Sequence, residues 1–238
     1  MNRAAFQEAL LAILERKAHR SDAALARGAI PRERFHIHLE QEWEVFVRDF
    51  PVFLGRAYVQ CPLAPVRRAL AENLYEDETG GLSAGRPHPE LFLELPRGLG
   101  FDLGRFERVT LLPGSRVYRE TLDRWTLGEG WEPAAAVATL WVEGTRFERG
   151  ELDPTAPRRP MPPLEEHPLR VHYNIPLEAL SLPRAHRAVE GGHRQAAWTM
   201  MLDHVPEARH GRVLEALEDC LRGWTAYRDA VAEACGVA

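Results

Sequence analysis

The amino-acid sequence predicts an all-α protein, and three observations support this fold class. Apolar residues recur at spacings of three and four along most of the chain, which is the period of an amphipathic helix. The alternation of apolar and polar residues that is typical of strands is nearly absent. No linker separates two apolar cores, so we expect one domain of seven or eight helices over residues 1–238.

Proline and glycine mark the ends of the predicted helices. Residues 3–18 place apolar side chains on one stripe, and a second helix begins after Pro31. Pro51 is expected to end or kink that helix, because proline lacks the amide donor. Gly80 and Gly81 are expected to stop a later one. The other predicted helices cover residues 52–60, 62–78, 88–97, 103–127 and 132–147, a helix that begins near Pro176 or Pro183 and ends at about residue 204, and residues 207–235. The proline-rich segment 150–163 is predicted to be a surface loop or lid.

Composition and charge exclude several classes of protein. The formal net charge of −5 argues against a general nucleic-acid binder, and no apolar run approaches the roughly 20 residues that cross a bilayer. The first 20 residues carry Glu8 and Glu15 and lack a small-residue cleavage site, so no signal peptide is expected. Three cysteines without close spacing predict no disulfide framework. A cytoplasmic enzyme is therefore expected, and Lys17 is its only lysine.

His186, Glu190 and His193 form an H-x3-E-x2-H cluster. At about 100° per residue these side chains fall within roughly 60° of one another on two successive helical turns. One helix face then offers two imidazoles and a carboxylate, a mixture that suits iron or manganese better than magnesium. The alternative is a chance spacing on a solvated helix, because short motifs have a high false-positive rate.

Two further stretches carry candidate ligands. Glu76 and Glu78 close one predicted helix, and His88 opens the next after a glycine-rich turn. A solvated acidic helix end that includes Asp77 is the alternative for this stretch. Glu143 stands in an otherwise apolar helix, where an unpaired carboxylate would cost several kcal/mol. A metal ion is a natural partner for Glu143, although a buried arginine would also serve.

The sequence resembles the heme-oxygenase-like diiron oxidases, which are related to the chlamydial death-domain-associating protein and to iron-containing redox enzymes of the same fold. The resemblance covers residues 43–203. It is carried in order by EWEVFVRDFPVFL, ENLYEDETGG followed by HPELF, LWVEGTRF and HYNIPLEALSLPRAHRAVEGGH. The metal ligands that this resemblance implies are Glu78, His88, Glu143, His186, Glu190 and His193, with Glu76 as a register alternative to Glu78.

Three features depart from the family pattern. Position 190 is Glu where the family usually has Asp, so this carboxylate reaches one methylene further. Gly191 and Gly192 interrupt the ligand helix at a cost of up to ~1 kcal/mol each, which close helix packing or a local distortion would explain. The proline-rich segment 150–163 is an insertion that reshapes substrate access or is decoration.

The resemblance implies a non-heme diiron oxidase that uses O2 to oxidise a small, amino-acid-derived substrate by N-oxygenation, desaturation or C–C cleavage. Two Fe(II) ions per chain are expected as the cofactor, with manganese as the alternative, and Glu143 is the candidate bridging carboxylate. The expected partners are the substrate and O2, with no nucleic acid and no membrane, and a homodimer is left open. Glu44 is kept as a seventh donor.

Rival hypotheses come from other classes. The same fold hosts a metal-free oxidase of the pyrroloquinoline-quinone-synthase type and a thiaminase-like enzyme with a cysteine nucleophile. Cys61, Cys220 and Cys235 have no recognisable catalytic context, so we interpret them as small buried hydrophobes. A non-catalytic small-molecule binding protein is a third class. Tyr58, Tyr75 and Tyr173 are candidates to orient the imidazoles, with core packing as the favoured alternative. Arg187 and Arg194 are candidates to anchor a substrate carboxylate, with exposed helix arginines as the favoured alternative.

Overall fold

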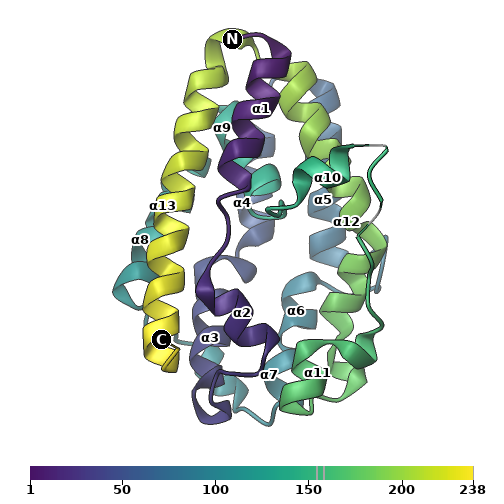
Figure 1. The fold of residues 1–238 in the computed structure, drawn as a ribbon. Coiled ribbons are helices and arrows are strands. Elements are labelled where there is room, and N and C mark those ends of the chain that lie inside the picture. The colour runs from purple at the N-terminus through teal and green to yellow at the C-terminus, as the bar shows by residue number, and fades with distance from the viewer. Residues whose placement is uncertain (154, 158, 238) are drawn as a thin grey trace.

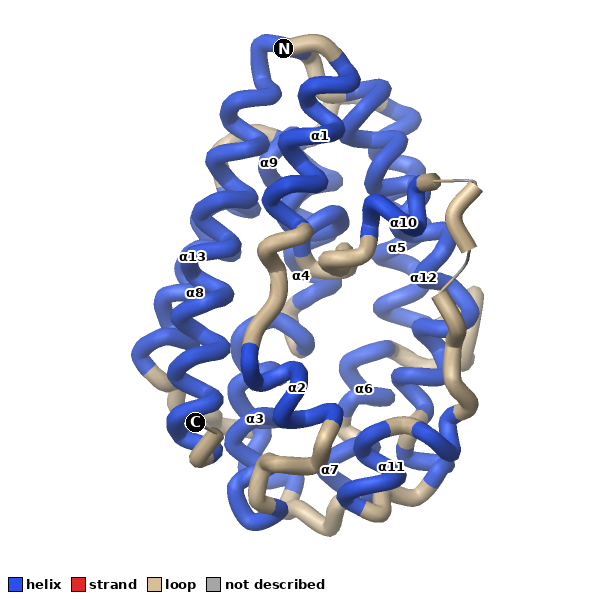
Figure 2. Tube along the Cα trace, viewed as in Figure 1, coloured by secondary structure: helices blue, strands red, loops and turns tan. Residues whose placement is uncertain are grey.

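The computed structural model describes residues 1–153, 155–157 and 159–237, and within these residues it contains helices and no strand (Figures 1 and 2). The predicted all-α class is therefore confirmed. The side chain of Glu190 lies outside the described part of the chain.

The helices are shorter and more numerous than predicted. Within the described residues the α-helices are α1 (Arg3–Leu14), α2 (Arg20–Ala26), α3 (Phe35–Glu42), α4 (Phe50–Gln60), α5 (Ala64–Thr79), α6 (His88–Phe92), α7 (Glu94–Gly98), α8 (Pro113–Leu127), α9 (Trp131–Ala135), α10 (Glu148–Leu152), α11 (Pro168–Tyr173), α12 (Ser181–Thr199) and α13 (His210–Cys235). Three π-helical segments continue α3, α9 and α12: η2 (Trp43–Val47), η4 (Ala136–Trp141) and η7 (Met200–His204).

Local chemistry explains where these helices begin and end. Pro51 lies in the first turn of α4, where a backbone amide has no partner within the helix and its absence is tolerated. The helix therefore begins just before Pro51, with Asp49 as its N-cap. Gly80 ends α5 in the left-handed conformation, at a φ of 63°, as predicted. The unpredicted helix α2 begins with a capping box between His19 and Asp22. Helix α10 occupies the start of the segment predicted to be a loop.

The long helices form the walls of the bundle and the short ones close one end (Figure 1). The C-terminal helix α13 packs along α8 and also contacts α1, so the first and the last helix of the chain are neighbours in the bundle. Helices α5 and α12 lie across the bundle from α13, and α2, α3, α6, α7 and α11 gather at the lower end. Large side chains such as Trp125, Trp141 and Phe53 are fully buried between these walls.

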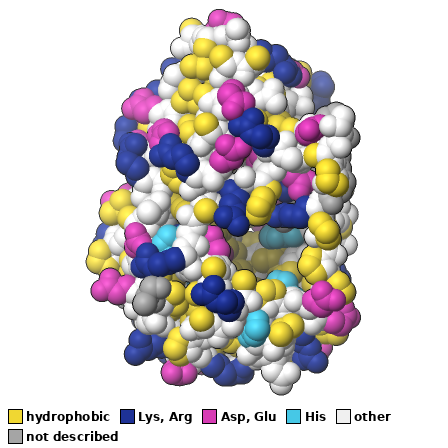
Figure 3. Space-filling model, in the orientation of Figure 1, with side chains coloured by type: hydrophobic (Ala, Val, Ile, Leu, Met, Phe, Trp, Pro, Cys, Tyr) yellow, Lys and Arg dark blue, Asp and Glu magenta, His cyan; other side chains and the backbone are white. Residues whose placement is uncertain are grey.

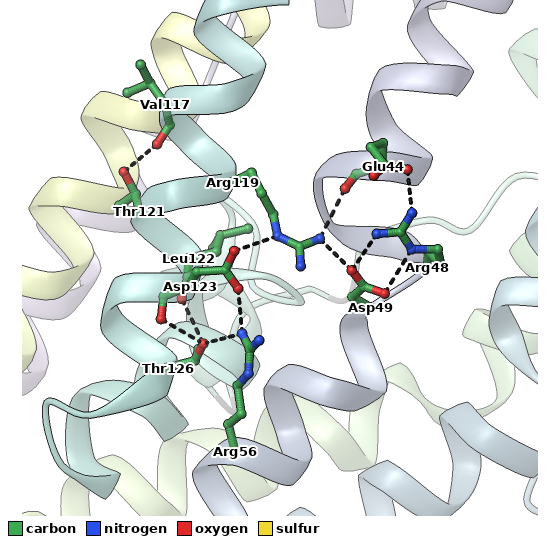
Figure 4. A network of polar contacts seen from close by, with 10 residues as sticks. All are labelled: Glu44, Arg48, Asp49, Arg56, Val117, Arg119, Thr121, Leu122, Asp123 and Thr126. Carbon is green, nitrogen blue, oxygen red and sulfur yellow. Dashed lines mark hydrogen bonds and ion pairs between the residues drawn. The ribbon is translucent and has the colours of Figure 1, made fainter. Parts of the chain in front are cut away.

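A network of ion pairs ties η2 and α4 to α8 (Figure 4). Arg119 of α8 donates to the carboxylate of Asp49 at 2.6 Å, to Asp123 at 2.9 Å and to the backbone carbonyl of Glu44 at 3.1 Å. Arg56 of α4 pairs with Asp123 at 2.6 Å from the other side. Because these groups are only partly exposed, the network holds the π-helical turn of η2 in place more firmly than exposed surface pairs would.

None of the described helices combines the length and the apolar composition that a bilayer-spanning helix needs.

Candidate metal centre

A cavity of about 280 Å³ lies between α3, η2, α4, α5, α6, α12 and the turn that follows η4. The space-filling view shows a hollow near the middle of one face, with histidine and basic side chains at its edge (Figure 3). Half of the described lining is made of metal-binding side chain types, namely Glu42, Asp77, His88, Glu143, His186 and His193. The other half is apolar and consists of Phe46, Val47, Phe50, Val142, Leu182 and Val189.

Helix α12 presents His186 and His193 to this cavity from two successive turns, in agreement with the predicted spacing. The imidazole of His186 lies 5.2 Å from that of His88, measured between ring centroids. The predicted ligand role of Glu190 falls on a side chain outside the described residues, so it stays a prediction. Gly191 and Gly192 face open space, since an added Cβ would meet no atom within 4 Å, and close helix packing does not explain them.

On α5 the carboxylate that lines the cavity belongs to Asp77 and not to Glu78. Val66, Leu70, Asn73 and Asp77 follow one another at intervals of four, three and four residues, and all four are buried. Glu78 is exposed, because one residue further turns the side chain by about 100° away from that face. The side chain of Asp77 therefore borders the cavity where the resemblance implied that of Glu78, and the ligand role of Glu78 stays a prediction.

Glu76, the register alternative, is fully buried but lies behind His88. Its carboxylate accepts the backbone amide of Leu82 at 2.5 Å and the hydroxyl of Ser83, which fixes the turn between α5 and α6. It also lies 3.0 Å from Nε2 of His88. The other ring nitrogen of His88, Nδ1, lies 3.0 Å from Oδ1 of Asp77. Glu76 thus orients the imidazole, as outer carboxylates do in metal sites.

Glu42 was not predicted to reach the site, and it lines the cavity from the last turn of α3. Its Oε2 lies 3.4 Å from Nε2 of His38, which is buried. Glu44, which was kept as a seventh donor, pairs instead with Arg48 (Figure 4). The helical interval from Phe35 through Leu39 to Glu42 is the signal that would have placed Glu42 on the inner face.

Glu143 lies two residues beyond η4, where its carboxylate meets α5 and α12. Nδ2 of Asn73 donates to its Oε1 at 3.0 Å, and Nδ1 of His193 lies 3.3 Å from the same oxygen. The remaining atoms, Oε2 of Glu143 and Nε2 of His193, are buried and have no hydrogen-bond partner. Leaving such atoms unpaired costs about 1–3 kcal/mol each, and a cation would satisfy both.

The donor set fits an iron or manganese ion in its chemistry. As the side chains stand, no group of three or more donors within the described residues is arranged to hold an ion, because the donors pair with one another. Three imidazoles and three carboxylates nevertheless border one cavity, and two of their atoms are unpaired. Nitrogen and oxygen donors without a thiolate suit iron and manganese.

Burial and neighbouring charges separate the pKa values of these groups. Burial raises the pKa of Asp77 to about 6, although His88 opposes it. Burial, followed by the charges of His88 and His193, lowers the pKa of His186 to about 4. Burial also lowers the pKa of His193, but Glu143 outweighs it and the net shift is upward. His186 is therefore neutral at pH 7, which is the form that binds a metal.

The remaining sequence candidates lie away from the cavity lining. Tyr58 and Tyr75 are exposed, and the buried Tyr173 donates to the carbonyl of Ile30. Arg187 and Arg194 line a separate cavity of about 660 Å³. The three cysteines are buried and free, and burial raises the pKa of each thiol, which disfavours a thiolate nucleophile.

Comparisons with known proteins show the fold and the family of the chain. The chain is similar to a CADD-like protein of unknown function from Nostoc punctiforme, whose crystal structure shares 13% sequence identity and a TM-score of 0.71 over 97% of each chain. This likeness shows the heme-oxygenase-like fold. No curated protein matches the sequence. A family model described as iron-containing redox enzyme matches residues 38–227. Since that match spans most of the chain, the protein belongs to the family of iron-containing redox enzymes.

Proposed function

We propose that the protein is an O2-dependent non-heme oxidoreductase that binds two iron ions and oxidises a small substrate. The observation that carries this proposal is the convergence of three histidines and three carboxylates on one cavity, where Oε2 of Glu143 and Nε2 of His193 are buried without a partner. Membership of the iron-containing redox enzyme family supports iron as the metal.

The residues that would hold the metal are Asp77, His88, Glu143, His186 and His193, with Glu42 and Glu190 as further carboxylates. Glu143 is the candidate bridging group, because its carboxylate lies between donors of α5 and α12. Iron bound there would supply the activation of O2 and the oxidation of the substrate.

Neighbouring side chains prepare these donors. Nε2 of His88 lies 3.0 Å from Glu76, so Glu76 would accept the Nε2 proton when Nδ1, the nitrogen that faces Asp77, binds a metal. Asn73 donates to one oxygen of Glu143 and leaves the other oxygen available. A donor set whose orientation is held in advance loses less conformational entropy when it binds a metal.

The apolar half of the cavity would receive the substrate. Phe46 and Phe50 line it from one side and Leu182 and Val189 from the other, so an apolar part of the substrate would be packed there and water excluded. A volume of about 280 Å³ restricts the substrate to a small molecule. We retain an amino-acid-derived compound as the proposed class, oxidised by N-oxygenation, desaturation or C–C cleavage.

An anaerobic Fe(II) titration followed by exposure to O2 tests this function. We expect close to two irons per chain and, on mixing with O2, a transient visible absorbance with O2 consumption. Manganese(II), titrated in parallel, serves as the alternative metal. Fewer than one iron per chain without O2 uptake would refute the proposal. In that case, O2 consumption with an organic substrate and no metal would indicate the metal-free oxidase, and binding without turnover would indicate a binding protein.

A further inference from the structure

Lys17, the only lysine in the chain, contacts the backbone on both sides of Glu143. It lies in the connection between α1 and α2, and its Nζ donates to the carbonyl oxygens of Trp141 at 2.5 Å and Gly144 at 2.8 Å. A third carbonyl, that of Val142, lies at 3.4 Å. The ammonium also lies 4.9 Å from the centroid of the Trp141 ring, within cation–π range.

These carbonyls lie at the end of a helix, where no helical amide follows that could donate a hydrogen bond to them. The last carbonyls of a helix carry partial negative charge, and a cation there is favourable. The turn is also tight, since a Cβ at Gly144 would lie 2.1 Å from the carbonyl oxygen of Leu140. A close backbone approach at Gly144 and a buried cation therefore lie at the same helix end.

We infer that Lys17 is a positioning residue for Glu143, which fixes the helix end so that the Glu143 carboxylate meets Asn73 and His193. This inference rests on the proposed function, because it assigns Glu143 a ligand role. The direction of a side chain depends on the conformation of its backbone. The three contacts of Lys17 with the backbone around Glu143 therefore restrict the direction of the Glu143 carboxylate. Lys17 lies outside the cavity lining and would act only through Glu143.

The ionisation state of Lys17 agrees with this role. Burial lowers the pKa of Lys17 to about 8, while the charge of Glu148 opposes that effect. The amine is therefore mostly protonated at pH 7, and the ammonium can donate to all three carbonyls at once.

The test compares Lys17→Met with Arg32→Met as a matched control. Arg32 also donates to two backbone carbonyls, those of Tyr173 at 2.5 Å and Leu99 at 2.8 Å, but neither Arg32 nor these two residues line the cavity. Co(II) is titrated into each metal-free protein at pH 7, and its visible absorption reports the ligand geometry. We expect Lys17→Met to bind Co(II) about 10–100-fold more weakly with an altered spectrum, as for other groups that orient ligands.

Arg32→Met is expected to bind Co(II) like the wild type even if it is less stable, and Lys17→Arg is expected to recover part of the lost affinity. Crystal structures of the metal-free wild type and Lys17→Met give a second readout. In the variant we expect the carbonyls of residues 141–144 to turn and the Glu143 carboxylate to leave Nδ1 of His193. If Lys17→Met does not fold, Lys17→Gln, which keeps a donor without the charge, replaces it in both measurements.

Wild-type affinity and spectrum in Lys17→Met, or an unmoved Glu143 carboxylate in its crystal structure, would overturn the inference. Failure of the proposed function has a different signature, because the wild type itself would then bind no metal. In that event the crystal structures still decide whether Lys17 positions Glu143.

Discussion

Replacing Asp77 by Asn tests two effects of this carboxylate separately: its effect on the free energy of unfolding of the metal-free protein and its effect on metal affinity. Asp77 is 3% exposed, and burial raises its pKa from 3.8 to about 6. A shift of about two units corresponds to about 3 kcal/mol at 1.36 kcal/mol per unit, which is the cost of ionising this carboxyl in the metal-free protein. Asn has nearly the same shape and no charge, so it removes that cost.

The sign of the effect follows from the direction of the shift. Because the pKa of Asp77 is higher in the folded chain than in the unfolded chain, the stability it contributes is full below about pH 4 and lost as the pH rises through about 6. Metal-free Asp77→Asn is therefore expected to be more stable than the wild type by about 3 kcal/mol at pH 7.5. At pH 4 the two should be nearly equal.

Urea denaturation of the metal-free proteins at both pH values measures this difference, and Co(II) titration measures the loss of affinity. We expect Asp77→Asn to gain stability and to lose at least tenfold in affinity. Glu78→Gln is the matched control: Glu78 is exposed, so its stability should change by less than about 0.5 kcal/mol and its metal affinity should not change. Equal stability at pH 7.5 together with unchanged affinity in Asp77→Asn would refute the reasoning.

Three further predictions follow from the contacts described above. His193→Ala is expected to abolish iron loading while the circular dichroism of the helices is retained, and an unchanged iron stoichiometry would count against its ligand role. Gly144→Ala places a Cβ 2.1 Å from the carbonyl oxygen of Leu140, so thermal unfolding should show a loss of about 1–3 kcal/mol, and an unchanged Tm would contradict that close contact. Two arginine partners lower the pKa of Asp49 to about 2. The ionised carboxylate therefore adds about 1–2 kcal/mol to the free energy of unfolding above pH 4, and this stabilisation is lost as the pH falls through about 2. Asp49→Asn should therefore be less stable by that amount at pH 7 and equal to the wild type near pH 2, and parallel stability curves down to pH 2 would argue otherwise.

The short helices and the π-helical segments are features that the spacing of apolar residues did not predict. A π-helical turn adds a residue without any signal in the spacing of apolar side chains. The sequence therefore predicts one continuous α-helix over residues 132–147, whereas the structure has α9 followed by the π-helical η4. The observed helix ends with η4, and the phase of every residue after the extra turn is altered. We infer that the orientation of Glu143 depends on this turn and on the contacts of Lys17.

The choice among neighbouring carboxylates could be predicted from the helical interval in two cases. On α5 the interval from Leu70 through Asn73 to Asp77 continues the apolar stripe, whereas Glu78 lies about 100° away from it. On α3 the same reasoning favours Glu42 over Glu44. For Glu78 the resemblance to the family motif pointed to a residue that is exposed, whereas the helical face indicated Asp77, which lines the cavity. Glu44 pairs with Arg48, and Glu42 lines the cavity.

The sequence by itself determined the all-helical class, the histidines of α12 and the presence of a carboxylate in an apolar helix. These features depend on residue type and on the 3.6-residue period, and both can be read along the chain. Only the tertiary structure decided which acidic side chains share the cavity and which histidine each one meets. The direction of a carboxylate depends on how its helix is rotated against its neighbours, and that rotation comes from packing between segments far apart in the sequence.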